Sequence, residues 1–324
     1  MFRLVLGLWL FTSLPAFAAG EELTPEETRA EFTYSRAVVT GIVEGFTEYL
    51  PISSTGHMII SDRLLNVRAD PNVTVAGLTD RKGRAIGLDR VADDYIVIIQ
   101  FGAILAVCVA FFARLRGLLV GLRRGERPAF ALASAILVAF IPAAALGFLC
   151  KEAITAYLFS VDVVAVALVV GGIAILVAER RLPPSRPADR DEVSAIGWRA
   201  ALTVGLCQCF ALIPGTSRSL ATILGGRIAG LSHAAATEFS FLVGLLTLSA
   251  ASVYKAWSLG PALAQVYPAG PAGVGLLVAA VTAFISVKWL VGYVSRRGLG
   301  VFAWYRIALG GAILAMSALR WALR

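Results

Sequence analysis

The sequence predicts an all-α integral membrane protein with two inverted repeats, each a re-entrant helical hairpin followed by three transmembrane helices. Of its 324 residues, 58% are hydrophobic and only 15% are charged, whereas soluble globular proteins average about 45–50% apolar and about 25% charged residues. The apolar residues fall in blocks of about 20, the length that crosses about 30 Å of hydrocarbon. Two further apolar regions are each interrupted by a proline, and each precedes three uninterrupted blocks.

The N-terminal residues 1–18 have the features of a secretory signal peptide. They combine an early arginine, a short apolar stretch and the small-residue pattern Ala16-Phe17-Ala18, which is typical of a cleavable signal. An uncleaved first span is the alternative. In either case we expect the polar segment that follows to lie outside the cytoplasm.

The apolar blocks lie near residues 95–113, 128–149, 154–178, 237–257, 272–294 and 302–323. The interrupted regions, 37–65 and 199–230, break at Pro51 and Pro214. Because proline removes a backbone donor and clashes with the preceding helical turn, we expect each region to form two short helices joined by a loop.

The two interrupted regions also resemble each other. "GIVEGF" (41–46) is similar to "GLCQCF" (205–210), and the two prolines align when one residue is skipped. We therefore predict a first membrane repeat at 37–178, a charged cytoplasmic linker at 179–196 and a second membrane repeat at 197–324, which together form one functional domain.

Charge predicts the topology. Each half has three spans, and because three is an odd number the second repeat would enter the membrane from the opposite face. Such inverted repeats typically place broken helices and the functional site near the middle of the membrane. Loop 114–127 carries five arginines and segment 179–192 four, which places both in the cytoplasm. Loop 62–94 disagrees, because it would lie outside yet carries six basic residues beside six aspartates. The net charge of +8 thus concerns topology, and the absence of a long basic patch argues against nucleic-acid binding.

Two glutamates stand out in the first interrupted region. Glu44 and Glu48 are four residues apart and would share one face of a helix. Two carboxylates at low dielectric cannot both stay ionised cheaply unless a cation or a proton lies between them, and oxygen ligands suit Mg²⁺ or Ca²⁺. The alternative is a polar patch at a helix end exposed to water.

The segment after Pro51 predicts an anion site. Ser53, Ser54 or Thr55 is expected to cap the next short helix, and a helix N-terminus inside the membrane attracts anions. His57 lies three residues beyond Ser54, close enough to share that site. Simple capping by the serines and a structural role for the histidine are the alternatives.

The motif "PGTSRS" (214–219) repeats this design in the second half. Gly215 permits a tight turn, and the hydroxyls of Thr216, Ser217 and Ser219 can cap the helix that follows. The guanidinium of Arg218 matches phosphate oxygens and stays charged when desolvated, although an arginine can also extend to the membrane surface. If the two hairpins meet, their residues suit the phosphate or diphosphate of a lipid.

Together, "GIVEGFTEYLPISSTGHMII" and "PGTSRS", with Thr222 beyond it, resemble the undecaprenyl-diphosphate phosphatases of the bacitracin-resistance type. The resemblance covers the chain from about residue 37 to its C-terminus. Leu220, Ile96 and Leu246 depart from the family pattern, which leaves substrate preference and efficiency in doubt more than reaction class.

This resemblance implies a multi-pass enzyme of the bacterial inner (plasma) membrane with its active site facing the periplasm. It would remove the terminal phosphate of undecaprenyl diphosphate, recycle the lipid carrier for peptidoglycan synthesis and confer bacitracin resistance, usually with Mg²⁺ or Ca²⁺. The partners are then the lipid substrate and the bilayer, with no nucleic acid, and a homodimer is compatible with this function.

On this basis the catalytic residues are Glu44, Glu48, Ser54, His57 and Arg218, with Glu44 and Glu48 also holding the metal. The substrate-binding residues are Ser53, Thr55, Gly215, Ser217, Ser219 and Thr222. Two mechanisms stay open: Ser54 acts as nucleophile with His57 as general base or acid, or Glu48 or His57 activates a water molecule while Ser54 only binds phosphate.

Two other classes of protein use a similar fold or similar chemistry. An inverted-repeat secondary transporter or lipid flippase would use the same fold and move a phosphorylated substrate without releasing phosphate. The phosphatidic-acid-phosphatase superfamily is excluded, because Leu224 stands where its motif requires a histidine.

Overall fold

The computed structural model describes residues 22–65, 67, 73–80, 83–185, 192–259 and 265–322, so the predicted signal segment lies outside the described residues. The chain forms two compact units, each built from separate stretches of sequence. The first unit comprises the described residues within Met1–Phe46, His57–Leu105 and Leu248–Ala283. The second comprises the described residues within Thr47–Gly56, Ala106–Thr247 and Phe284–Arg324.

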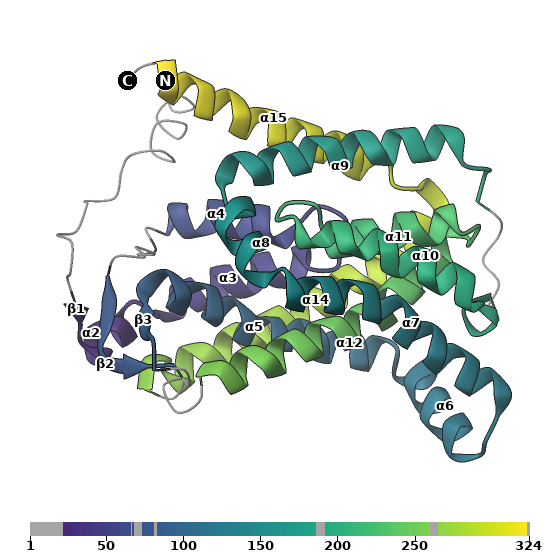
Figure 1. Ribbon diagram of the computed structural model, residues 1–324, viewed down its shortest axis with the longest axis horizontal. Helices are drawn as coiled ribbons and strands as arrows, with labels where there is room; N and C mark the ends of the chain where they lie inside the picture. The colour runs from purple at the N-terminus through teal and green to yellow at the C-terminus, as the bar shows by residue number, and fades with distance from the viewer. Residues whose placement is uncertain are drawn as a thin grey trace. The chain divides into compact units, whose positions relative to one another are not determined.

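Helices dominate the described residues (Figure 1). In chain order they are α2 (Pro25–Ala30), α3 (Tyr34–Thr47), α4 (Ser54–Leu64), α5 (Leu88–Ala110), α6 (Phe112–Arg123), α7 (Arg127–Leu149), α8 (Lys151–Leu158), α9 (Val161–Arg181), η1 (Glu192–Ala195), α10 (Trp198–Gln208), η2 (Cys209–Leu212), α11 (Arg218–Ile228), α12 (His233–Leu259), α14 (Ala269–Arg297) and α15 (Gly300–Ala322). Within the described part, six helices are long and apolar enough to cross a membrane: α5, α7, α9, α12, α14 and α15. This confirms the predicted helical membrane fold, whereas the inverted relation of the two repeats stays a prediction.

Some predicted boundaries were wrong. The block at 154–178 is not one helix, because the chain breaks after α8 and restarts at α9, where the hydroxyl of Ser160 accepts a hydrogen bond from the backbone N–H of Val163 at 3.2 Å. The block at 95–113 begins earlier, at Leu88, because α5 includes a charged first turn. Helix signals at the polar ends of an apolar block are weak, which explains both errors.

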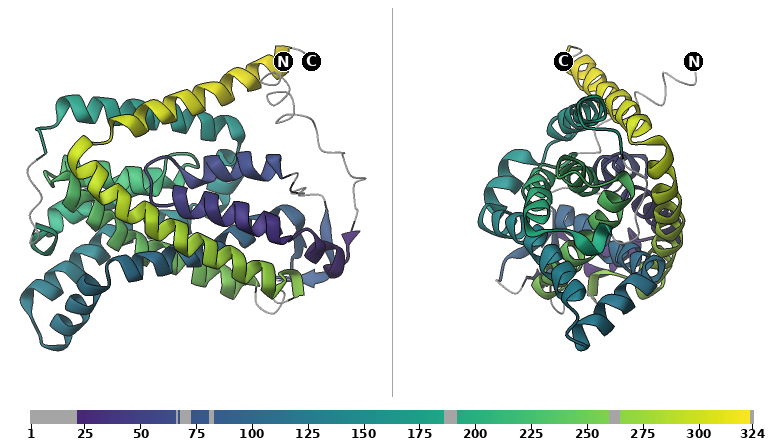
Figure 2. Two further views of the ribbon diagram at one scale, coloured as in Figure 1. Left: turned by 180° about the vertical axis from the view of Figure 1, so that it is seen from behind. Right: turned by 90° about the vertical axis from the view of Figure 1, so that its right-hand side faces the viewer.

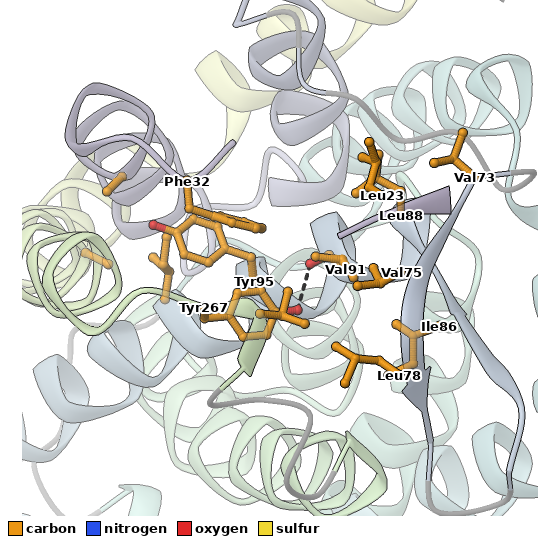
Figure 3. Packing of buried hydrophobic residues seen from close by; sticks show 14 residues of the cluster. Leu23, Phe32, Val73, Val75, Leu78, Ile86, Leu88, Val91, Tyr95 and Tyr267 are labelled. Carbon is orange, nitrogen blue, oxygen red and sulfur yellow. Dashed lines mark hydrogen bonds between the residues drawn. The ribbon is translucent and has the colours of Figure 1, made fainter. Parts of the chain in front are cut away.

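The first unit contains a small sheet that the sequence did not predict. Strands β1 (Glu22–Leu23), β2 (Thr74–Thr79) and β3 (Ala85–Gly87) lie in the order β1-β2-β3, with β1 parallel and β3 antiparallel to β2. Figure 3 shows its apolar side chains, such as Val75 and Ile86, in one buried cluster with Phe32, Tyr95 and Tyr267. The Tyr267 hydroxyl donates to the carbonyl of Val91 at 2.8 Å.

Ion pairs in the first unit account for part of the basic charge in loop 62–94, which the positive-inside rule did not explain. The buried carboxylate of Asp80 accepts hydrogen bonds from Arg84 Nη2 and Arg90 Nη1, both at 2.9 Å. Asp94 lies 3.6 Å from Arg90 Nε and also pairs with Lys255. Two basic residues of this loop, Arg84 and Arg90, are therefore paired with aspartates.

In the second unit, α9 and α15 run side by side (Figures 1 and 2). Small residues allow this close approach: a Cβ on Gly172 would lie 2.7 Å from the carbonyl oxygen of Ala303, and one on Gly310 would lie 2.7 Å from that of Ala165. Such small-residue contacts are common between membrane helices. Helices α10 and α11 pack on each other, and α10 also packs on α7.

Both interrupted regions form two short helices joined by a turn, as predicted. The first region comprises α3 and α4, with the chain turning at residues 48–53. The second comprises α10, the 3-10 turn η2 and α11, with the turn at 213–217. The two turns, 48–53 and 213–217, belong to the second unit.

Candidate active site

The two turns share an unusual backbone conformation. Ser53 has φ 74° and Ser217 has φ 75°, and they are the only non-glycine residues with positive φ in the described part of the chain. Each serine immediately precedes a helix and accepts a hydrogen bond from that helix's first turn, Ser53 Oγ from Gly56 N at 3.5 Å and Ser217 Oγ from Leu220 N at 3.3 Å. A non-glycine residue held in such a region costs about 1–3 kcal/mol, so surrounding contacts must hold it there.

This conformation corrects the alignment of the two halves. The same number of positions separates Gly41 from Gly205 as separates Ser53 from Ser217, so no residue needs to be skipped. Pro51 then corresponds to Gly215 and not to Pro214. The prolines misled the alignment because each ends a helix at a slightly different point.

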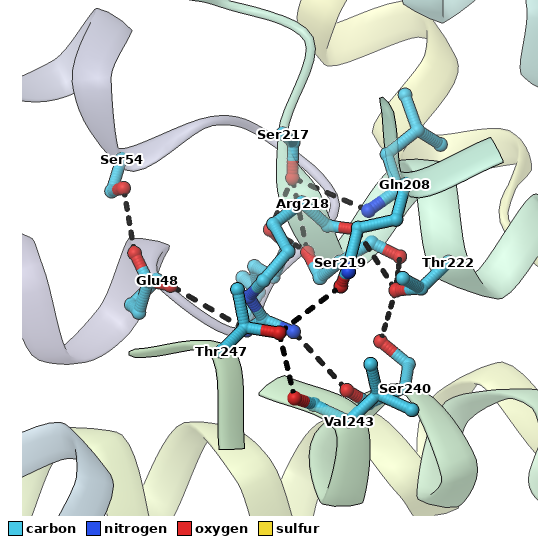
Figure 4. Close-up of polar contacts among 12 residues, drawn as sticks. Glu48, Ser54, Gln208, Ser217, Arg218, Ser219, Thr222, Ser240, Val243 and Thr247 are labelled. Atoms are coloured by element: carbon cyan, nitrogen blue, oxygen red, sulfur yellow. Dashed lines mark hydrogen bonds and ion pairs between the residues drawn. The ribbon is translucent and has the colours of Figure 1, made fainter. Parts of the chain in front are cut away.

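Glu48 links the two turns (Figure 4). The hydroxyl of Ser54 donates to Glu48 Oε2 at 2.8 Å, and Arg218 Nη2 lies 3.5 Å from Glu48 Oε1. The side chains of Arg218 and Glu48 are only 9% and 6% exposed. The catalytic candidates Glu48, Ser54 and Arg218 are therefore brought together by the fold.

The environment of Arg218 leaves hydrogen-bonding capacity for an anion. Its Nη1 donates to the carbonyl of Ser240 at 3.1 Å, and its Cζ lies 5.4 Å from the ring centroid of Tyr49. Its Nε is buried and has no hydrogen-bond partner within the described residues. Buried donors are almost always satisfied, and the contact with Glu48 is longer than an ordinary 2.7–3.2 Å hydrogen bond. An unused donor beside a long ion pair can accommodate a phosphate oxygen.

The hydroxyls after Arg218 bond to the protein itself. Ser219 Oγ donates to the carbonyl of Leu50 at 2.9 Å and also lies 3.0 Å from Ser217 Oγ. Thr222 Oγ1 donates to the carbonyl of Arg218 at 2.8 Å. Ser219 and Thr222 are fully buried. In this structure they fasten α11 to the neighbouring backbone, and direct substrate contact by either remains a prediction.

The remaining predicted residues lie differently. The expectation that Glu44 and Glu48 share a helix face is wrong, because α3 ends at Thr47 and Glu48 lies in the turn. Glu44 is buried in the first unit, and His57 is also assigned to that unit. Their roles beside Glu48 remain predictions. Thr55 is exposed at the start of α4.

The described side chains offer few ligands for a metal ion. Among the described residues, no three His, Cys, Asp or Glu side chains lie close enough together to hold a metal ion. In the second unit, Glu48 supplies one carboxylate that already accepts from Ser54 and pairs with Arg218. These groups do not form a complete metal site by themselves, so a divalent cation would need further ligands such as substrate phosphates.

Sequence reasoning missed Arg306, Gly244 and Tyr49. Arg306 is completely buried in α15 and bonds to both turns. Gly244 makes room for the Arg218 guanidinium, whose Cζ would lie 2.6 Å from an added Cβ. The only available signal was an arginine inside an apolar block, because ionisable residues at membrane depth are rare and commonly functional.

Comparison with known proteins gives a consistent family. A family model described as "Bacitracin resistance protein BacA" matches residues 37–312. The chain is 45% identical over 281 residues to Undecaprenyl-diphosphatase 2 of Rhodospirillum rubrum, covering 86% of this chain and 93% of that protein. It is 41% identical over 279 residues to the undecaprenyl-diphosphatase of Methylococcus capsulatus, covering 86% and 93%. Because the match spans both broken-helix turns and the helices that hold them, the chain belongs to the bacitracin resistance protein BacA family.

Proposed function

We propose that this protein hydrolyses undecaprenyl diphosphate to undecaprenyl phosphate and inorganic phosphate, and thereby recycles the lipid carrier for peptidoglycan synthesis and confers bacitracin resistance. The observation that carries the proposal is that the buried Glu48 contacts both Ser54 and Arg218, the first residues of α4 and α11. The names of the chain's relatives support the same activity.

Arg218 binds the diphosphate in this proposal. A phosphate oxygen takes up its unused Nε and competes with Glu48 for Nη2. A guanidinium forms two parallel hydrogen bonds to phosphate, which fixes orientation as well as charge. The first turns of α4 and α11 add backbone N–H groups and the positive ends of their helix dipoles.

Ser54 is the nucleophile that we propose. Its Oγ attacks the terminal phosphorus, the bond from that phosphorus to the bridging oxygen breaks, and undecaprenyl phosphate leaves. Glu48 takes the hydroxyl proton, since its Oε2 already accepts from Ser54 at 2.8 Å. Glu48 then passes this proton to the departing undecaprenyl phosphate and is ionised again. In the second step Glu48 takes a proton from the attacking water, the bond from phosphorus to Ser54 Oγ breaks, and Glu48 returns the proton to that Oγ, which releases inorganic phosphate and free Ser54.

Direct attack by water is the alternative, with Glu48 or His57 as base and Ser54 as a phosphate ligand. Trapping the enzyme with substrate and searching for phosphoserine at Ser54 by mass spectrometry separates the two. Loss of activity in Ser54→Ala agrees with both, whereas full activity in this variant excludes the serine nucleophile.

The divalent cation stays part of the proposal, with Glu44 and Glu48 as the carboxylates assigned to it. Bound there, Mg²⁺ or Ca²⁺ would neutralise phosphate charge. No reaction step depends on it here, because the second unit supplies only one of these carboxylates. Activity with and without EDTA, followed by addition of each metal, tests the requirement.

A groove beside the second turn offers a place for the polyprenyl chain. This groove has a volume of about 630 Å³ and is almost entirely apolar, with Ala174 on one wall and Thr216 and Leu220 close to Ser217. A lipid whose diphosphate binds at Ser217 and Arg218 can place its chain there.

We further propose that the protein lies in the inner membrane with its active site open to the periplasm. We also propose a homodimer, which cross-linking can test.

The decisive experiment measures phosphate release from undecaprenyl diphosphate by the purified protein in detergent. Release by the wild type, lost in Glu48→Gln and Arg218→Ala, is the expected result. Arg199→Ala and Ser134→Ala are matched controls, since both side chains are exposed and lie outside the site. Substrate movement across liposomes without phosphate release would instead indicate the transporter or flippase.

A further inference from the structure

Arg306 makes the same contact with both turns. Its Nη1 donates to the carbonyl of Pro51 at 3.2 Å and its Nη2 to the carbonyl of Gly215 at 3.0 Å. Pro51 and Gly215 each lie two residues before a serine with positive φ. One guanidinium thus fixes the distance between the two strained turns.

The charge of Arg306 is not neutralised locally. The side chain is completely buried, and its third hydrogen bond goes to the carbonyl of Ala167 at 3.0 Å. Its hydrogen-bond partners within the described residues are all backbone carbonyls, and its Nε has none. An arginine at membrane depth costs about 2.5–3.5 kcal/mol even on the mildest scale. A neutral side chain would be a cheaper way to fill the same space.

We propose that Arg306 is a positioning residue for the phosphatase reaction, which holds the Ser53 and Ser217 turns in register and leaves a positive charge behind them that favours the bound diphosphate. This inference rests on the proposed phosphatase activity. Arg306 acts through the two turns and is not assigned a contact with the reacting atoms.

The two parts of this role predict different kinetic changes. Arg306→Lys keeps the charge but cannot reproduce the fork that spans two carbonyls, so kcat should fall at least tenfold while KM stays within threefold of wild type. Arg306→Met removes both, so kcat should fall and KM should rise at least fivefold. Added methylguanidinium should restore part of the kcat of Arg306→Ala.

Gly171→Ala tests position without removing charge. A Cβ there would overlap Nη2 of Arg306 and lie 2.9 Å from its Cζ, so kcat should fall at least fivefold with little change in melting temperature. Gly311→Ala is the matched control on α15, because an added Cβ there meets nothing within 4 Å.

The outcomes separate this inference from the proposed function. If the wild type releases no phosphate, the proposed activity fails and this inference fails with it. If the wild type is active but Gly171→Ala and Arg306→Lys keep wild-type kcat, only the positioning role is refuted. If Arg306→Met does not fold, those two variants decide. Activity that merely follows the fraction of folded protein across all variants would also overturn the proposal.

Discussion

Gly244→Ala should disable Arg218 without touching a charged residue. The guanidinium of Arg218 lies directly over Gly244 of α12, where an added Cβ would be 2.6 Å from Cζ and 2.9 Å from Nη2. Carbon atoms in contact are normally about 3.5–4.0 Å apart. The guanidinium must therefore move by roughly 1 Å, away from the carbonyl of Ser240 and from its position beside Glu48.

The size of the effect follows from what this movement breaks. A hydrogen bond to a charged group contributes about 1.5–3 kcal/mol, and each 1.36 kcal/mol changes a rate about tenfold. We therefore expect kcat/KM for undecaprenyl diphosphate to fall about 10- to 100-fold. The fold should survive, because alanine is favoured over glycine inside a helix by about 0.5–1 kcal/mol.

Phosphate release and the melting temperature in detergent should be measured on the same preparations of wild type, Gly244→Ala and the control Gly311→Ala. The control should match the wild type in both. The reasoning is refuted if Gly244→Ala keeps more than about one third of wild-type kcat/KM, which is less than 1 kcal/mol of transition-state stabilisation. It is equally refuted if activity falls only in proportion to the folded fraction.

Four further outcomes follow from the structure. Arg218→Lys keeps the charge but loses the fork, so phosphate release should fall about tenfold or more, with the exposed Arg199→Lys unchanged. Ala174→Trp should fill the apolar groove and raise KM for undecaprenyl diphosphate more than for a short-chain prenyl diphosphate. Gly215→Ala should lower the melting temperature, because φ is +94° there and the strain alone costs roughly 1–3 kcal/mol. Hydrogen bonds from Thr24 lower the pKa of Glu27, so amide protection at the start of α2 should persist above the ordinary carboxyl pKa and be lost as pH falls through the lowered pKa.

Hydropathy was sufficient to predict the spans, because it depends on composition along one segment and not on tertiary contacts. Proline and glycine chemistry predicted the two broken regions for the same reason. The C-terminal end of α3 could not be predicted as well. The helix ends at Thr47, so Glu48, the next residue, lies in the turn and not on the helix face. Local patterns define such boundaries only to within one or two residues.

Long-range contacts account for most of what the sequence could not predict. Arg306 is 255 positions from Pro51 and 91 from Gly215, and no local pattern indicates that one side chain joins them. The need for glycine at position 244 becomes visible only in the folded chain, where the Arg218 guanidinium packs against the Gly244 backbone. The sheet of the first unit was missed because its strands are short, and because β2 and β3 lie in a charged loop.

The unfavourable features of the second unit point to one location. Ser53 and Ser217 have positive φ. The buried guanidinium of Arg306 donates to a carbonyl in each of the two turns that contain these serines, and the guanidinium of Arg218 pairs with Glu48 in the first turn. Each feature costs stability by itself, and glycine, asparagine or an apolar side chain would be cheaper at these positions. Sequences depart from local rules mainly where function requires it. The shared position of these departures, more than any single motif, supports the proposal that the diphosphate binds and reacts at the two turns.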